Sequence, residues 1–275
     1  MIDSTDSTIM PSRSSEADFD EILFNRPVSN LSRRKIGILA CRHASLRSIS
    51  ATYSVLIALG HNVLLVADIV HQNNQLPADV WLTSNNKRNY QNSDVAIEAL
   101  MDCNVIINLV EGELNSTMEL FTARLFESYG GVYVSDYPKI FKNHSYEGKK
   151  IIFSSLQKIA DAKHITTKLT GIIQVSKLLS QVSGELSASI VATNHNQLIA
   201  LESSSAGTAC IVNAKNNISI VDFMAIFVGL LADSSDTKAE LWLKYCQAAG
   251  FLYRNHYSES KNGVADLKKY LNEKF

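Results

Sequence analysis

Two aspartates stand where a carboxylate could do chemistry. Asp222 lies at the start of an apolar stretch that predicts a helix, so it could act as a general base at a helix N-terminus. The alternative is a carboxylate that the helix dipole favours in the first turn. Asp136 ends a segment that predicts a strand, and open α/β sheets bind ligands at their carboxyl edge. The alternative is an ordinary loop acid before Pro138.

Two polar segments in the second half of the chain could hold a ligand. The run Asn194-His195-Asn196 could line a polar pocket, although such residues are also common in turns. Residues 203–208 form a small-residue loop that could bind an anion through backbone N–H groups, or simply connect two elements. The candidate catalytic residue is Asp222, and the candidate cofactor-binding residues are Asp136, Asn194, Gly207 and Thr208.

The sequence contains no motif for a metal site, a Walker-type phosphate loop or a nucleophilic serine or cysteine. The remaining histidines show no metal-ligand spacing, so we expect no metal site. No phosphate-binding glycine loop of the Walker type and no serine or cysteine nucleophile motif is present. The four cysteines are far apart, form no CxxC pair and lie in apolar segments, so we expect buried, reduced thiols.

The elements that would position these residues begin with a strand, a helix and a second strand. Residues 35–41 are continuously apolar after Lys35, as in a parallel strand covered on both faces. Residues 46–59 have apolar side chains at helical spacing, and Gly60 stands where a helix commonly ends. Residues 62–67 predict the second strand, which completes a unit of βαβ size.

The same alternation continues and then changes character near residue 188. The predicted elements are helices over 94–101, 116–129 and 167–182, strands over 104–110, 132–135 and 150–153, a hairpin over 189–193 and 197–201, a strand over 208–212, and helices over 222–232, 236–256 and 264–271. This order predicts an α/β fold, a three-layer α/β/α sandwich whose mainly parallel sheet has an antiparallel edge. Residues 1–32 are polar and predict an arm or tail, and residues 33–275 predict a single domain.

Composition narrows the classes of partner. Among 275 residues, 26 Lys and Arg balance 27 Asp and Glu, so the chain has no net field to attract nucleic acid or an anionic membrane. The apolar run over 218–232 contains Asp222 and is too short to span a bilayer. No basic segment followed by an apolar one opens the chain, so we expect a cytoplasmic protein without a secretory signal.

Three stretches resemble the carbohydrate-kinase-like domain of ADP/ATP-dependent NAD(P)H-hydrate dehydratases, within the ribokinase-like superfamily. They are residues 33–41 with the following helix and strand, residues 102–136, and residues 218–232, whose Gly229-Leu230-Leu231-Ala232 end is similar to the family's helix. The resemblance implies a ribokinase-like fold and ADP or ATP with Mg, or NAD(P), as ligands. Members of this fold commonly self-associate, so it also implies a homo-oligomer.

The family's signature motifs are missing. Its Gly-x-Gly-Asp motif lets backbone N–H groups approach a phosphate and supplies a base. Here the aligned residues 218–221 read Ile-Ser-Ile-Val, and Asp222 comes one position late, which turns it by about 100° around a helix. The first loop, glycine-rich in the family, reads Cys-Arg-His-Ala-Ser-Leu over residues 41–46.

We therefore expect a divergent, catalytically impaired protein of this type that still binds a nucleotide or dinucleotide. One alternative is a non-catalytic oligomeric scaffold or regulatory module. Another is an active dehydratase or small-molecule kinase whose site is rebuilt around Asp222 and Asp136.

Overall fold

The computed structural model describes eleven stretches of the chain. They are residues 35–74, 76–84, 90–137, 139–144, 146–155, 188–194, 197–202, 209–213, 219–232, 239–257 and 262–274. The predicted arm over 1–32 and the predicted helix over 167–182 lie outside these residues, and so do His195, Gly207 and Thr208.

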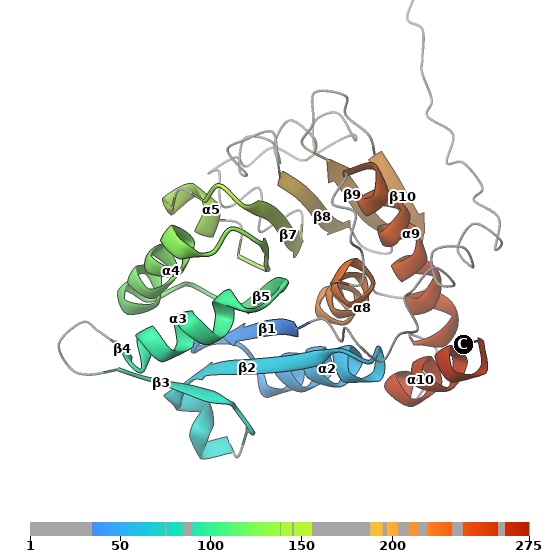
Figure 1. Ribbon diagram of the computed structural model, residues 1–275. Coiled ribbons are helices and arrows are strands. Elements are labelled where there is room, and N and C mark those ends of the chain that lie inside the picture. Colours follow the sequence, from blue (N-terminus) through green and yellow to red (C-terminus); the bar gives the residue numbers. More distant parts are fainter. Residues whose placement is uncertain are drawn as a thin grey trace, which may run out of the picture.

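A single sheet runs through the molecule, and most of its strands are parallel (Figure 1). Its strands are β1 (Lys35–Ala40), β2 (Asn62–Asp68), β3 (Val80–Ser84), β4 (Tyr90–Gln91), β5 (Val105–Leu109), β6 (Val132–Ser135), β7 (Lys149–Ser155), β8 (Ala188–Asn194), β9 (Gln197–Glu202) and β10 (Ala209–Asn213). They lie in the order β10-β9-β8-β7-β6-β5-β1-β2-β3-β4. All pairings from β3 to β8 are parallel, whereas β4 pairs antiparallel with β3, β9 with β8, and β10 with β9.

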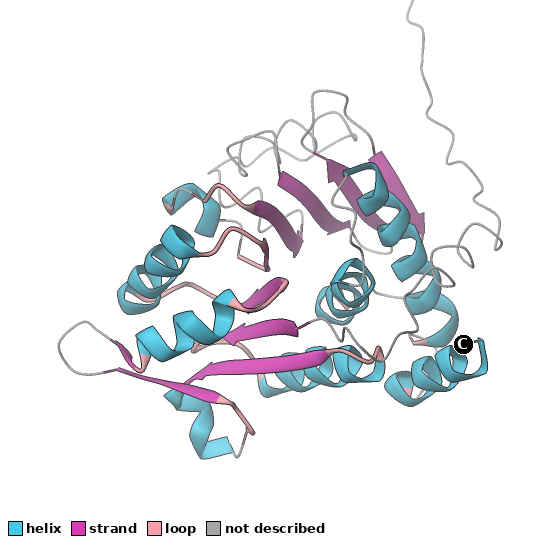
Figure 2. Cartoon of the chain, in the orientation of Figure 1, coloured by secondary structure: helices cyan, strands magenta, loops and turns pink. Residues whose placement is uncertain are grey.

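Helices cover both faces of the sheet, as Figure 2 shows. The described helices are α2 (Leu46–Ala58), the 3-10 helix η1 (Ile69–Asn74), α3 (Ser93–Met101), α4 (Ser116–Ser128), α5 (Ile140–Asn143), α8 (Ile220–Ala232), α9 (Ala239–His256) and α10 (Gly263–Lys274). One hydrophobic core joins the sheet to α2, α8, α9 and α10, and a second joins it to α3, α4 and α5. The predicted three-layer α/β class is thereby confirmed.

Strand β1 lies between the two cores and contributes to both, because successive side chains of a strand point to opposite faces. Ile36 and Ile38 face the core with α2 and α8, and Leu39 faces the core with α3 and α4. A strand covered on both faces is apolar at every position, which is why residues 35–41 show no alternation of polar and apolar types.

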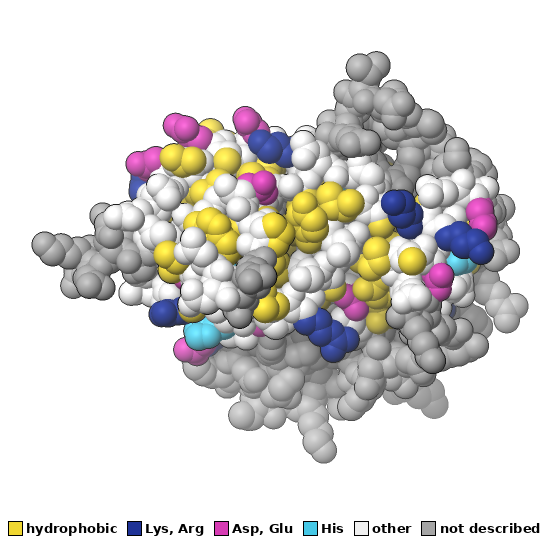
Figure 3. All heavy atoms as spheres, turned by 90° about the horizontal axis from the view of Figure 1, so that it is seen from below, with side chains coloured by type: hydrophobic (Ala, Val, Ile, Leu, Met, Phe, Trp, Pro, Cys, Tyr) yellow, Lys and Arg dark blue, Asp and Glu magenta, His cyan; other side chains and the backbone are white. Residues whose placement is uncertain are grey.

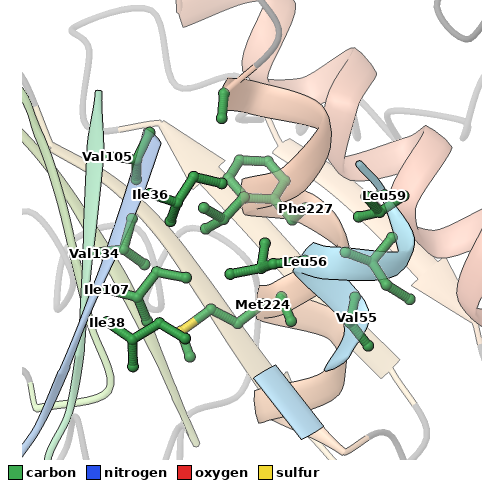
Figure 4. Close-up of a cluster of buried hydrophobic side chains, with 14 of the residues drawn as sticks. Ile36, Ile38, Val55, Leu56, Leu59, Val105, Ile107, Val134, Met224 and Phe227 are labelled. Atoms are coloured by element: carbon green, nitrogen blue, oxygen red, sulfur yellow. The ribbon is translucent and has the colours of Figure 1, made fainter. Parts of the chain in front are cut away.

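Helix α8 is deeply buried against the sheet. Every residue from Phe223 to Ala232 is buried. Most helices have an apolar stripe on one side only, whereas α8 is apolar all the way round over this stretch. Figure 4 shows Met224 and Phe227 pointing between the strand side chains and those of α2. Gly229 allows this approach, because a Cβ there would lie 2.3 Å from Cδ1 of Leu59. Among the described helices, none is long and apolar enough to cross a bilayer.

The ends of two helices test the predicted boundaries. Gly60 has a φ of +89°, which glycine adopts at little cost, and α2 ends there as predicted. Helix α4 begins at Ser116, as predicted. Asn115 is the N-cap of α4, because its side-chain oxygen accepts the backbone N–H of Met118 at 2.8 Å.

Three cysteines have described side chains, and all three are free and buried, as predicted: Cys41, Cys103 and Cys246. Burial raises the pKa of the Cys103 thiol to about 11, with Asp102 adding to the rise and Lys35 opposing it. The unfolded thiol titrates near pH 8.5, so between about pH 9 and 11 the unfolded chain has lost a proton that the folded chain keeps.

The free energy of unfolding is therefore expected to fall as the pH rises through this window. In Cys103→Ala it should fall less steeply with pH than in the wild type. The measurement is the free energy of unfolding in urea at about pH 8, 9.5 and 11 for both proteins. Identical slopes in the two proteins would contradict the expectation, since the other titrating groups are common to both.

Candidate functional site

The carboxyl ends of β1 and β5 form a topological switch point. From β1 the chain crosses through α2 on one face to β2, whereas α3 and α4, on either side of β5 in the sequence, lie on the opposite face. The two loops that follow these strands therefore leave in opposite directions. In open α/β sheets, ligands bind in the crevice that such a divergence leaves.

Asp136 lies at this edge, one residue after β6, and is 6% exposed. Its Oδ1 accepts the backbone N–H of Val110 at 2.7 Å, and its Oδ2 accepts that of Glu111 at 3.0 Å. The carboxylate predicted to bind a cofactor thus joins the end of β6 to the β5–α4 loop. Both oxygens meet backbone donors of this loop, and cofactor binding by Asp136 stays a prediction.

Glu111 is a residue of the site that the sequence did not single out. Its backbone is left-handed, with φ of 48°, and its Oε2 accepts the backbone N–H of Ser45 at 2.8 Å. Its Oε1 accepts the hydroxyl of Ser48. The N-terminus of α2 is therefore held by a carboxylate from a loop more than sixty residues away along the chain. A negative charge is favourable there because the helix dipole is positive at that end.

Beneath these loops lies a buried polar chain that crosses three strands. The thiol of Cys41 donates to Oδ1 of Asn108 at 3.0 Å, and Nδ2 of Asn108 donates to the Tyr133 hydroxyl at 2.8 Å. Burial, and then the charges of Asp136 and Asp68, raise the pKa of the Cys41 thiol well above its ordinary value. Cys41 is consequently a protonated hydrogen-bond donor and is poorly suited to act as a nucleophile.

Asp222 lies in the first turn of α8, close to the same edge of the sheet. Helix α8 runs parallel to α2: the His61 ring, just after α2, hydrogen-bonds to the carbonyl of Gly229 at 2.8 Å near the far end of α8. The N-cap of α8 is Ser219, whose Oγ accepts the N–H of Asp222 at 3.5 Å and whose own N–H donates to the Tyr253 hydroxyl at 2.9 Å.

The side chain of Asp222 faces the end of α9. The Tyr257 hydroxyl donates a hydrogen bond to Asp222; burial, followed by the Asp222 charge and this bond, raises the pKa of Tyr257. The positive charge of Arg47, in the first turn of α2, opposes that rise. Arg47 of α2, Asp222 of α8 and Tyr257, the residue after α9, therefore lie within electrostatic reach of one another.

The other predicted residues are placed only in part. Asn194 ends β8 and lies opposite Gln197 of β9 in the register of the two strands. Gly207 and Thr208 lie outside the described residues. In the part of the chain that the structure describes, no three His, Cys, Asp or Glu side chains gather in a way that could hold a metal ion.

No protein-family model and no curated protein matches the sequence. Several solved structures are similar to it over most of their length. A hypothetical protein from Streptococcus mutans is 10% identical, with a TM-score of 0.69 over 95% of this chain and 99% of the other. A ribokinase-like superfamily protein from Enterococcus faecalis is 12% identical, with a TM-score of 0.65 over 96% and 91%. The ADP/ATP-dependent NAD(P)H-hydrate dehydratase from Bacillus subtilis, co-crystallised with ATP/Mg2+, is 11% identical, with a TM-score of 0.51 over 93% and 96%.

Proposed function

We propose that this chain, which has the ribokinase-like fold, is a catalytically impaired relative of the NAD(P)H-hydrate dehydratases that binds a nucleotide beside the first turn of α8. The observation that carries the proposal is the state of Asp222. It is the acid nearest to the place of the family's base, yet its carboxylate is engaged by the hydroxyl of Tyr257. A general base must reach the proton that it removes, and this side chain faces a neighbouring helix.

The same surroundings favour a phosphate. The first turn of α8 points its positive dipole end toward this edge, and Arg47, in the first turn of α2, is exposed. The dehydratase from Bacillus subtilis was crystallised with ATP/Mg2+, which supports a nucleotide as the ligand. Magnesium would arrive with the nucleotide, because this ion is commonly held by substrate phosphates together with one or two carboxylates.

The test is a thermal melting series with ATP, ADP, AMP, NAD(H) and NADP(H), each with and without magnesium. A nucleotide at about one hundred times its dissociation constant adds roughly 2.7 kcal/mol to the free energy of unfolding. We expect ATP or ADP to raise the melting temperature, and Arg47→Gln to reduce that rise. Arg124→Gln is the matched control, since Arg124 is an exposed cation of α4 paired with Asp94.

Two results would contradict parts of the proposal. If no nucleotide shifts the melting temperature, the nucleotide site is wrong. If the protein dehydrates hydrated NAD(P)H at an enzyme-like rate, its site is not impaired, and the alternative of a rebuilt site holds. Asp222→Asn should then abolish that turnover with little change in the melting temperature.

A self-associating scaffold is the second candidate, and one surface favours it. Figure 3 shows hydrophobic side chains gathered over one face of the molecule. The large apolar residues exposed on α2 and η1 are Leu46, Ile57 and Ile69, which are 37%, 46% and 38% exposed. Light scattering over a range of protein concentrations distinguishes the candidates, because a monomer at every concentration would exclude the scaffold.

A further inference from the structure

The two loops that border the switch point are joined to each other. One is the β1–α2 loop, residues 41–45, and the other is the β5–α4 loop, residues 110–115. Glu111 makes the connection, since one carboxylate oxygen accepts the N–H of Ser45 and the other accepts the hydroxyl of Ser48. A crevice that would ordinarily lie open between diverging loops is thus bridged by a side chain of the protein.

The position of Glu111 is imposed by Asp136. A left-handed backbone is unfavourable for a residue with a side chain, so it needs support from its surroundings. Asp136 supplies that support by accepting the N–H groups of both Val110 and Glu111. The two carboxylates therefore act in series: Asp136 shapes the loop, and the loop presents the Glu111 carboxylate to α2.

A second contact brings the loops together farther along. A Cβ added to Gly112 would lie 3.2 Å from Cβ of His43, closer than most such contacts. The backbone at Gly112 therefore packs directly against the side chain of His43. The two loops therefore meet at both the Glu111 and the Gly112 positions.

We infer that Glu111 is a specificity-determining residue, whose carboxylate occupies the N-terminus of α2 and excludes phosphate groups from the crevice between β1 and β5. A phosphate placed there would face this negative charge and would compete for the same two donors, Ser45 N–H and the Ser48 hydroxyl. The inference rests on the proposed function, which it makes more specific. The nucleotide phosphates lie on the α8 side, and the ligand group above the switch point is neutral or cationic.

The test compares the binding of inorganic phosphate, measured by titration calorimetry, in the wild type and three variants. Glu111→Gln removes the charge and keeps the size of the side chain. Glu111→Asp keeps the charge, and Glu113→Gln removes an exposed charge from the same loop as a matched control. We expect phosphate to bind Glu111→Gln about tenfold more tightly than the wild type, because a like charge facing the ligand is lost. The other two variants should differ from the wild type by less than about twofold, since both retain the Glu111-position charge.

Two outcomes would overturn the inference: an unchanged phosphate affinity in Glu111→Gln, or an equal gain in Glu111→Asp. If Glu111→Gln does not fold, Glu111→Met provides a neutral side chain of similar length for the same comparison. ATP is titrated in parallel. Absence of ATP binding in every protein would refute the proposed nucleotide site, whereas the phosphate comparison between variants reports on Glu111 independently.

Discussion

Phe227→Ala is expected to lower the free energy of unfolding by about 3–5 kcal/mol, as truncation of a buried aromatic ring commonly does. Phe227 is 1% exposed and lies between the sheet and α2 (Figure 4). Its ring centroid is 5.4 Å from that of Phe153 on β7. Removing the ring leaves a cavity in the middle of the core that joins α8 to the sheet, and the dense packing of α8 on both sides limits collapse around it.

Urea denaturation of the wild type and the variant measures this loss. Val95→Ala is the matched control: Val95 lies on α3 and is 55% exposed, so its truncation should change stability by less than about 0.5 kcal/mol. Phe227→Leu should cost less than Phe227→Ala, because it retains most of the buried volume. A loss below about 1 kcal/mol in Phe227→Ala would show that α8 is not central to the core.

Asp136→Ala is expected to destabilise the fold by about 2–4 kcal/mol, because it leaves two backbone N–H groups without their charged acceptor. These are the N–H groups of Val110 and Glu111, which donate to the two oxygens of Asp136 at 2.7 and 3.0 Å. The stability of Asp136→Asn should lie between those of the wild type and Asp136→Ala. Its amide oxygen can accept one of the two hydrogen bonds, while its NH2 group faces the other donor.

The control for Asp136 is another carboxylate with a different environment. Asp94 pairs with Arg124 on the surface, and its side chain is 78% exposed, so Asp94→Ala should cost less than about 1 kcal/mol. Chemical denaturation of the variants provides the comparison. Similar losses for Asp94→Ala and Asp136→Ala would contradict the role of Asp136 as the acceptor that holds the β5–α4 loop.

Features with a local cause could be predicted from the sequence. Gly60 ends α2 because glycine tolerates a positive φ, and the prediction needed only the periodicity of the preceding residues. The strands β3 and β4 and the helices η1 and α5 were not predicted. Strand β4 and the two helices are too short for a periodic pattern to distinguish them from loops.

In the candidate site, too, the residues with a local signal were predicted and those with only distant partners were not. Asp136 and Asp222 were identified because each ends or begins an apolar segment, which is a local signal. Glu111 was missed, since it is an ordinary acid in a polar loop and its partners are 66 and 63 residues away. The partner of Asp222 was missed for the same reason, because Tyr257 is brought to it only when α9 packs against α8.

The sequence by itself determined the class of fold, because the spacing of neighbouring apolar residues predicts the alternation of strands and helices. It also determined that β1 would be covered on both faces, because its residues are apolar without alternation. Only the tertiary structure decided which donors the carboxylates at the edge of the sheet would meet. Those contacts join residues distant in sequence, and their geometry depends on how the loops after β1, β5 and β6 pack together.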